Sequence, residues 1–288
     1  MAPYFSVITP VYNGSNFVCS YVRSLISQTF QDWEAIIVDD FSTDNTIQVL
    51  TSLINDDPRF KIVQTSTDIL SSSRKGPYKP RNTGLHIATG RFICFLDIDD
   101  VWLKNKLSDQ FLLLSSSPGL KLLYGSYFKS DATLRRGYLK PQIGFMSIKF
   151  QLNFWNPIPN LTSCVDSSVA KAHEFRPVGH EDYLYWHGLV STLTENQIAL
   201  TLRPQSIYRT SPASVSGNKS TVFLWWMNCY HLIGHGLLIS FVFIGLKFLA
   251  ELIEFFLVRS GIIKTIDLSS LCGISDSVVF QEDQRLLR

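Results

Sequence analysis

The chain has 288 residues, which is long enough for one large domain or two small ones with a substantial hydrophobic core. Lys and Arg total 26 and Asp and Glu total 24, so the net charge of +2 lacks the basic excess of nucleic-acid binding proteins, and no nucleic-acid partner is expected. Hydrophobic residues make up an ordinary 45%, but charged residues make up only 17%, below the typical share of about 25%. Part of the chain is therefore expected to face an apolar environment.

From residue 4 to about residue 130, short runs of β-branched and aromatic residues alternate with segments of helical periodicity. This alternation predicts β-α-β units and an α/β fold, in which a Rossmann-like, mainly parallel sheet is flanked by helices. The predicted strands are Phe5–Thr9, Ala35–Val38, Phe60–Gln64 and Phe92–Leu96. The predicted helices are Phe17–Ser27, Thr43–Ile54 with Ser42 as its N-cap, and a third that begins after Pro80 and ends at Gly90.

Residues 130–220 follow a less regular pattern, because prolines interrupt it repeatedly. One compact helix is predicted there, from about Glu181 to Thr192. No internal repeat is visible in the chain. Residues 1–220 are therefore interpreted as one catalytic-type domain, and residues 221–288 as a separate helical region.

The C-terminal region has the composition of a membrane-associated segment. Residues 221–246 contain no Lys, Arg, Asp or Glu, and a helix over Leu237–Val258 would carry a narrow polar stripe opposite a broad apolar face. The stripe consists of Ser240, Lys247, Glu251 and Glu254. This pattern favours a helix that lies in the plane of the membrane, with Trp225, Trp226 and Tyr230 at the headgroup level. A helical hairpin buried against the protein and a true membrane span are the alternatives.

The cysteines and the N-terminus bear on the compartment. Five scattered cysteines form no CxxC pair, as expected for free thiols in a reducing environment. The first residues carry no basic segment followed by an apolar run, so no secretory signal is expected. The protein is therefore expected at the cytoplasmic face of the plasma membrane, as a peripheral or monotopic protein.

Three carboxylates, Asp97, Asp99 and Asp100, follow directly after a predicted buried strand. Ligands of open α/β sheets bind at the carboxyl ends of the strands, where these acids fall. Alternation along the chain places Asp97 and Asp99 on one side, and two hard oxygen donors at that spacing suit Mg²⁺ or Mn²⁺ bridging a diphosphate. An acidic turn that caps the following segment is the structural alternative.

Other candidates end the neighbouring strands. Asp39 and Asp40 follow the second strand, where one of them can accept a hydrogen bond from a base or ribose while Asp39 can equally serve a turn. Tyr12 follows the first strand and offers a flat face for a base. Arg81 and Asn82 open a helix near the same edge, where a cation and helix N–H groups favour phosphate, although a surface Arg can also merely pair with an acid.

These motifs together resemble the inverting glycosyltransferases of family 2, which have the GT-A fold, over about residues 4–216. The matching blocks are residues 6–13 (SVITPVYN), 27–34 (SQTFQDWE), 39–44 (DDFSTD), 81–91 (RNTGLHIATGR) and 95–102 (FLDIDDVW). The resemblance implies that Pro10, Tyr12 and Asp40 hold the nucleotide and that Arg81 lies near it. It also implies that Asp97 and Asp99 form the DxD element, with Asp99 as the direct metal ligand.

The family also places an acidic pair at the start of a helix in its second half, and residues 180–183 (HEDY) resemble it. Inverting transfer needs a base that takes the proton of the acceptor hydroxyl, and Asp182 is the candidate while Glu181 orients the acceptor or a basic partner. An ordinary acidic helix start is the alternative. Arg209 resembles part of the family's closing segment and is a candidate phosphate ligand, because Ser211 stands where many relatives carry a metal-binding His.

The residues and the resemblance together predict a metal-dependent, inverting glycosyltransferase. The expected donor is a nucleotide sugar, with UDP the common nucleotide of the family, and the expected acceptor is a lipid-linked saccharide of bacterial surface polysaccharide. A non-catalytic, membrane-associated protein that binds nucleotide sugars or saccharides is the alternative, and a membrane scaffold is a further one. A nicotinamide dehydrogenase is discounted, because no GxGxxG motif follows a predicted strand.

Overall fold

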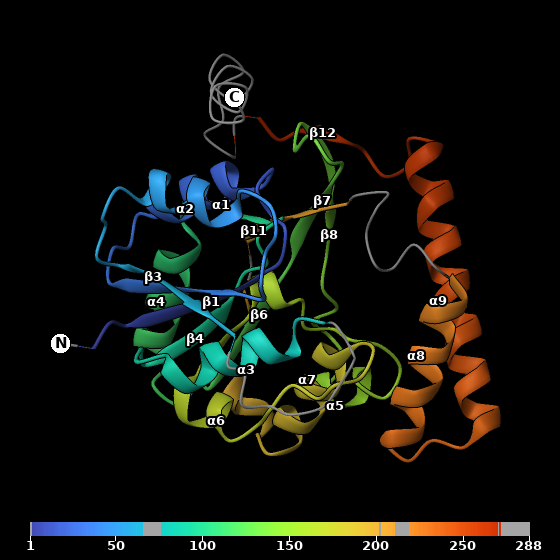
Figure 1. Ribbon diagram of the computed structural model, residues 1–288. Helices are drawn as coiled ribbons and strands as arrows, with labels where there is room; N and C mark the ends of the chain where they lie inside the picture. Colours follow the sequence, from blue (N-terminus) through green and yellow to red (C-terminus); the bar gives the residue numbers. More distant parts are fainter. Residues whose placement is uncertain (1, 66–75, 202, 211–218, 270, 272–288) are drawn as a thin grey trace.

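The computed structural model describes residues 2–65, 76–201, 203–210, 219–269 and 271 (Figure 1). Its larger sheet has seven strands in the order β10-β6-β9-β4-β1-β2-β3. These strands are β1 (Phe5–Val11), β2 (Trp33–Asp39), β3 (Phe60–Gln64), β4 (Phe92–Phe95), β6 (Leu122–Gly125), β9 (Cys164–Asp166) and β10 (Ile198–Thr201). The four strands predicted in the N-terminal half are confirmed, each within two residues at either end.

The sheet is mixed rather than wholly parallel. β1 pairs in parallel with β2 and β4, whereas β9 runs antiparallel between β4 and β6. A second sheet of five strands follows the order β12-β8-β7-β11-β5. Its strands are β5 (Val101–Trp102), β7 (Tyr127–Ser130), β8 (Arg136–Lys140), β11 (Ser206–Arg209) and β12 (Ile266–Asp267). The observed class is therefore an α/β fold with a mixed sheet, because the chain returns through β9 in the proline-interrupted region.

Helices cover both faces of the larger sheet. Every residue of β1 and β2 is buried, as expected for strands packed on both sides. One hydrophobic cluster joins the sheet to α1 (Val18–Ile26), α2 (Thr46–Ile54) and α4 (Lys106–Ser116). The cluster on the opposite face joins it to α3 (Tyr78–Ile87), α5 (Ile148–Gln151), α6 (Ser167–Lys171) and α7 (Glu181–Ser191). The predicted helix at residues 181–192 is thus confirmed.

Two predicted helix starts are corrected. α2 begins at Thr46 with Asn45 at its N-cap position, so Ser42 is not the cap. Instead, the backbone N–H of Ser42 donates to the Asp39 carboxylate at 3.1 Å, and the residues between form a turn. α3 begins at Tyr78, before Pro80, and ends at Ile87 rather than at residue 90. Proline still occupies the first turn, where its missing N–H has no helical partner to lose.

The C-terminal region forms two helices, α8 (Lys219–Leu232) and α9 (Leu237–Arg259), which pack against each other (Figure 1). α8 belongs to the same hydrophobic cluster as α7, and its Trp226, Cys229 and Tyr230 are buried. The headgroup position predicted for Trp226 and Tyr230 is therefore wrong. Their rings pack on Tyr183 and on each other, and the Tyr230 hydroxyl donates to the carbonyl of Phe154. α8 thus follows the predicted alternative of a helix buried against the protein.

α9 confirms the predicted helix at Leu237–Val258, extended by one residue. In the part of the chain that the structure describes, no helix combines the length and the hydropathy needed to cross a bilayer. Two residues of the polar stripe of α9 face the protein, whereas Glu251 is exposed. Ser240 is 1% exposed, and Glu254 accepts hydrogen bonds from Tyr138 and Lys129 and pairs with Lys140. Most of the large apolar side chains of α9 are exposed. A helix on a water-facing surface would instead bury its apolar side chains and expose its polar ones.

A buried carboxylate fixes the edge of the sheet farthest from the strands' carboxyl ends. Glu34, 4% exposed, accepts hydrogen bonds from the hydroxyls of Ser6 and Thr89 and from the backbone N–H of Thr89, and it pairs with Lys61 at 2.6 Å. Burial raises the pKa of Glu34, but these donors outweigh burial and lower it to about 2. The carboxylate form of Glu34 therefore joins β1, β2, β3 and the turn between α3 and β4.

We expect Glu34→Gln to lower the free energy of unfolding at pH 7 by about 2–3 kcal/mol. The reason is that the folded protein stabilises the Glu34 carboxylate through donors that the unfolded chain does not hold in place. The folded pKa of Glu34 lies below the unfolded value, so its contribution is complete above pH 4.5 and is lost as the pH falls toward 2. Urea unfolding of both proteins from pH 7 to pH 3 measures this. A stability difference that does not narrow below pH 4.5 would contradict the assignment.

Candidate functional site

The candidate site is built around a buried arginine on α3. Arg81 is 3% exposed, and its guanidinium donates through Nη1 to Oε1 of Glu181 at 2.6 Å. Its Nη2 donates to Oδ1 and Oδ2 of Asp97 at 2.8 and 3.1 Å. Arg81 thus joins the acidic turn after β4 to the first residue of α7. Three residues that the sequence nominated separately are parts of one charge network.

The acidic turn carries more negative charge than its protein neighbours compensate. Burial and the neighbouring charge of Asp97 raise the pKa of Asp99 to about 6. Burial and the charge of Asp99 also hold the pKa of Asp100 well above its usual range, although the backbone N–H of Arg209 donates to it at 2.9 Å. A raised carboxyl pKa means that the anionic form lacks a partner. A cation at Asp99 would supply one.

The donor set fits a divalent cation that is shared with a ligand. Within the described residues, no three His, Cys, Asp or Glu side chains are arranged to enclose a metal by themselves. Mg²⁺ and similar hard ions are commonly held by one or two carboxylates, with substrate phosphates and water completing the shell. Asp97 and Asp99 match that minimal set in number and in chemistry. The turn therefore suits a metal that arrives with a diphosphate.

Arg209, at the end of β11, binds the backbone of the acidic turn. Its Nε donates to the backbone carbonyl of Asp99 at 2.8 Å, its Nη2 to the Ser20 hydroxyl at 2.7 Å, and its Nη1 to the carbonyl of Ala132 at 3.1 Å. These contacts tie β11 to the turn, to α1 and to the loop after β7. The structure therefore places Arg209 beside the acidic turn in a clamping position, and its role as a phosphate ligand stays a prediction. Ser211 lies outside the described residues.

The residues nominated for the nucleotide lie at adjacent strand ends. Pro10 is buried in β1 beside Val38 of β2, and Val11 pairs with Asp39. The next residues, Tyr12 and Asp40, therefore leave the sheet at the same edge. Tyr12 is 50% exposed, as a stacking residue would be. Asp39, in contrast, is buried and binds the backbone of the following turn, so the structural alternative holds for it.

An asparagine beside this edge was not singled out from the sequence. Asn13 adopts the left-handed conformation, with φ of 51°, and its Oδ1 accepts from the backbone N–H of Thr43 at 2.7 Å. Its own N–H donates to the Ser42 hydroxyl at 3.0 Å. Asn13 thus locks the loop after β1 to the loop after β2. The signal for this was available, because Asn is the non-glycine residue that most readily takes this conformation.

The acidic pair at the start of α7 is divided between two partners. Glu181 is bound by Arg81, and burial raises its pKa although the charge of Arg81 opposes this. Asp182 is half-buried and accepts from Nδ2 of Asn156 at 2.9 Å. Asn156 was not identified from the sequence, because it follows no strand and belongs to no recognised block. The structure therefore gives the two carboxylates different surroundings.

A reciprocal amide pair holds the acidic pair at its distance from α3. Nδ2 of Asn82 donates to the carbonyl of Phe175, and the backbone N–H of Phe175 donates to Oδ1 of Asn82, both at 2.9 Å. The ring of Phe175 stacks on Tyr185 of α7 with 4.0 Å between the ring centroids. The segment before α7 is thereby bound to α3 one residue after Arg81.

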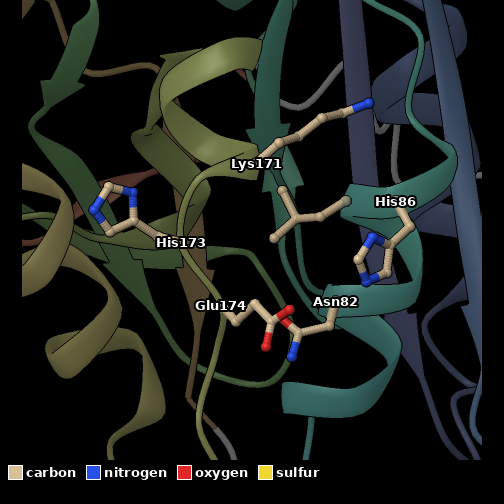
Figure 2. Close-up of a pocket in the computed structure, with 6 residues that line it drawn as sticks. Asn82, His86, Lys171, His173 and Glu174 are labelled. Carbon is tan, nitrogen blue, oxygen red and sulfur yellow. The ribbon is translucent and has the colours of Figure 1, made fainter.

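A small pocket lies between α3 and the segment after α6 (Figure 2). Its lining residues are Asn82, Leu85, His86, Lys171, His173 and Glu174. Asp97, Asp99 and Asp182 do not line it, and the Asn82 amide is already paired with Phe175. We therefore place the candidate site at the acidic turn and not in this pocket.

Comparison with known proteins shows the family to which the chain belongs. Residues 6–167 match the family described as "Glycosyl transferase family 2". The chain belongs to glycosyltransferase family 2. An uncharacterized glycosyltransferase of Haemophilus influenzae is 30% identical over 229 residues, which cover 79% of this chain and 88% of the relative. The Escherichia coli protein WfgD, named a UDP-Glc:alpha-D-GlcNAc-diphosphoundecaprenol beta-1,3-glucosyltransferase, is 32% identical over 222 residues, 74% of this chain and 80% of the relative.

Solved structures share the GT-A fold with this chain. Staphylococcus aureus TarS 1-349 in complex with UDP-GlcNAc aligns with a TM-score of 0.58 and 22% identity, over 76% of this chain and 61% of that one. The mannosyltransferase PcManGT from Pyrobaculum calidifontis, in complex with GDP-Man and Mn²⁺, aligns with a TM-score of 0.58 and 16% identity, over 82% and 66% of the two chains. This chain thus spans about three fifths of the solved TarS chain. It is a glycosyltransferase that acts on nucleotide sugars.

Proposed function

We propose that this glycosyltransferase is metal-dependent and inverting, and that it moves a sugar from a UDP-sugar to a lipid-linked saccharide. The observation that carries this proposal is the division of the acidic pair: Arg81 binds Glu181, while Asp182, next in the chain, is held only at one oxygen by the amide of Asn156 in the described contacts. A carboxylate that is not held in an ion pair with an arginine is free to accept a proton. Asp182 is therefore the base, and Glu181 is the partner that keeps Arg81 in place.

The donor is proposed to lie across the carboxyl ends of β1, β2 and β4. Tyr12 stacks on the base, Pro10 shapes the floor beneath it, and Asp40 accepts from the base or ribose. The UDP-sugar named for WfgD and the UDP-GlcNAc complex of TarS support UDP as the nucleotide. Both belong to proteins that resemble this chain, and neither defines its sugar.

The metal is proposed to be Mn²⁺ or Mg²⁺, held by Asp99 and Asp97. When bound, it would neutralise the charge that develops on the departing diphosphate. The Mn²⁺ in the PcManGT complex supports a divalent ion of this kind. Arg81 holds Asp97 in place from the other side, and Arg209 holds the backbone of Asp99.

Transfer with inversion requires attack on the face of the sugar opposite the diphosphate. The acceptor hydroxyl oxygen forms a bond to the anomeric carbon, the bond from that carbon to the diphosphate oxygen breaks, and Asp182 takes the hydroxyl proton. Arg81 contacts the acidic turn through Asp97 and the acidic pair through Glu181, so it keeps the proposed metal site close to the helix that carries the proposed base.

The acceptor is proposed to reside in a membrane that α9 contacts. The outward face of α9 exposes large apolar side chains along its whole length: Leu237, Leu238, Phe241, Val242, Leu246, Leu249, Leu252, Ile253 and Phe256 are each between 49% and 79% exposed. Soluble proteins seldom expose so long a continuous apolar surface. An interfacial helix buries such a face at the acyl boundary, and WfgD is named for an acceptor on diphosphoundecaprenol. We therefore propose that the protein lies on the cytoplasmic surface of the plasma membrane.

Asp99→Ala is expected to abolish metal-dependent binding of the donor, because a hard ligand is lost where the diphosphate charge must be compensated. Calorimetry with UDP-glucose and UDP-GlcNAc, in the presence of Mn²⁺ or of a chelator, measures this. Asp32→Ala changes an exposed aspartate directly before β2, at the other end of the parallel strands from the acidic turn, and is the matched control. An Asp99→Ala protein whose affinity still rises with Mn²⁺ as the wild type's does would place the metal elsewhere.

Asp182→Asn is expected to keep the fold and the donor affinity and to lower sugar transfer by about 10²–10⁴-fold, the usual contribution of a positioned base. Initial rates with a GlcNAc-diphospho-lipid acceptor and calorimetry of the donor test both halves of this expectation. Near-normal transfer would assign the base to another group. Donor binding with no transfer even by the wild type, across nucleotide sugars and acceptors, would favour the non-catalytic binding protein.

The double variant Leu238→Glu/Phe256→Glu is expected to bind vesicles of phosphatidylethanolamine and phosphatidylglycerol more than about tenfold more weakly. Each substitution puts a charge in place of an exposed apolar side chain that the proposed membrane contact would bury. Flotation of vesicles with bound protein measures this. Leu112→Glu changes a leucine of α4 that is 65% exposed and is the matched control. A different outcome is that the wild-type protein does not bind vesicles but self-associates, and that the double variant is monomeric. This result would instead assign the exposed face of α9 to contact with a second copy of the chain.

A further inference from the structure

The C-terminal hairpin packs directly on the segment that begins α7. A Cβ atom built on Gly179 would lie 2.0 Å from the ring of Trp225, so only glycine allows α8 to approach this closely. The thiol of Cys229 also donates to the carbonyl of Gly179 at 3.1 Å. The start of the catalytic helix therefore rests on α8.

His180, directly before the acidic pair, is held by the same helix. It adopts the left-handed conformation with φ of 54°, and its ring lies over Trp226 with 4.3 Å between the ring centroids. Burial lowers the pKa of His180 to about 4, and its Nε2 is buried without a hydrogen-bond partner. At neutral pH, His180 is thus an uncharged ring that fills the space between Trp226 and the backbone of α7.

Lys247 of α9 packs on the same Trp226 ring. Its Nζ lies 3.8 Å from the centroid of the Trp226 ring, a cation–π contact turned toward the protein. Burial lowers the pKa of Lys247 to about 8, against the opposing charges of Glu251 and Asp182. Lys247 is therefore close enough to Asp182 for their charges to interact, and at pH 7 it is mainly a cation.

The titratable groups around Asp182 come from four helices. α3 supplies Arg81, α7 supplies Glu181 and His180, α8 supplies the Cys229 thiol, and α9 supplies Lys247, with Glu251 and the nearby Lys140 acting on Lys247. The guanidinium of Arg81 is shared between Asp97 and Glu181. Lys247, in contrast, lies over the ring of Trp226.

We infer that Lys247 is a positioning residue for transfer, which through Trp226 and His180 holds the first turn of α7, and with it Asp182, in place. This inference rests on the proposed role of Asp182 as the base. It makes the C-terminal hairpin part of the catalytic apparatus as well as the proposed membrane contact. A helix that binds the membrane on one face would then support the base through the other.

The test compares Lys247→Met, Lys247→Arg, Asp182→Asn and the double variant Lys247→Met/Asp182→Asn in the full-length protein, with transfer measured to a GlcNAc-diphospho-lipid acceptor and donor affinity by calorimetry. Lys247→Met is expected to lower kcat about tenfold while the donor affinity changes less than about twofold. Lys247→Arg keeps the charge over Trp226 and is expected to retain most of the activity. Lys264→Met, at an exposed lysine beyond α9, is the matched control.

Two further readouts separate positioning from mere folding. In the double variant, Lys247→Met is expected to cost nothing beyond Asp182→Asn, because the position of residue 182 no longer affects the rate once the base is absent. The activity of the wild type is expected to fall as the pH rises through about 8, where Lys247 loses its proton, and Lys247→Arg is expected to lack this fall.

Additive losses in the double variant, or a Lys247→Met protein with a full transfer rate, would overturn the inference. So would an equal loss in Lys247→Arg and Lys247→Met at an unchanged melting temperature. A failure of the proposed function looks different: Asp182→Asn alone would then transfer at a near-normal rate.

Discussion

The arrangement of the site depends on one buried guanidinium. Transferring Arg81 from water to the interior is unfavourable unless carboxylates receive its donors, and Asp97 and Glu181 do so at 2.6–2.8 Å. Since one acid follows β4 and the other begins α7, the ion network sets the distance between the acidic turn and α7. Removing one member would leave a buried charge without its partner, which typically costs about 3–5 kcal/mol. The same contacts that stabilise the fold therefore fix the spacing between the proposed metal site and the proposed base.

Much of the N-terminal half was predictable, because local patterns determine it. Strands such as β1 and β2 are continuous apolar runs, and their carboxyl ends carry the candidate residues wherever the rest of the chain lies. The acids after β4 were found for the same reason. The starts of α2 and α3 were misplaced because they depend on contacts between loops: Asn13 reaches 30 residues along the chain to bind Thr43. Helix-capping preferences alone contain no such information.

The second half was less predictable because tertiary contacts decide it. The aromatic cluster at the start of the uncharged segment has the composition of a membrane interface, yet Trp226 and Tyr230 serve the core. Composition records that a residue avoids water and not which apolar phase receives it. Likewise, Asn156 donates to Asp182 across 26 residues, and the charge of Asp182 acts on the pKa of Lys247 from 65 residues away (247 − 182). No spacing in the sequence connects these groups.

The orientation of α9 determines which surface the C-terminal region exposes. Its Glu254 is bound inside the protein by Lys129, Tyr138 and Lys140 of the second sheet, while most of its large apolar side chains face outward. In water this arrangement leaves large hydrophobic area exposed, and at a bilayer surface the same area becomes favourable. Because α8 shares a hydrophobic core with α7, the α8–α9 hairpin has little freedom to move independently of α7. Docking of α9 on a membrane would therefore orient the acidic pair relative to the bilayer, and an acceptor carried by lipid would meet Asp182 from a fixed direction.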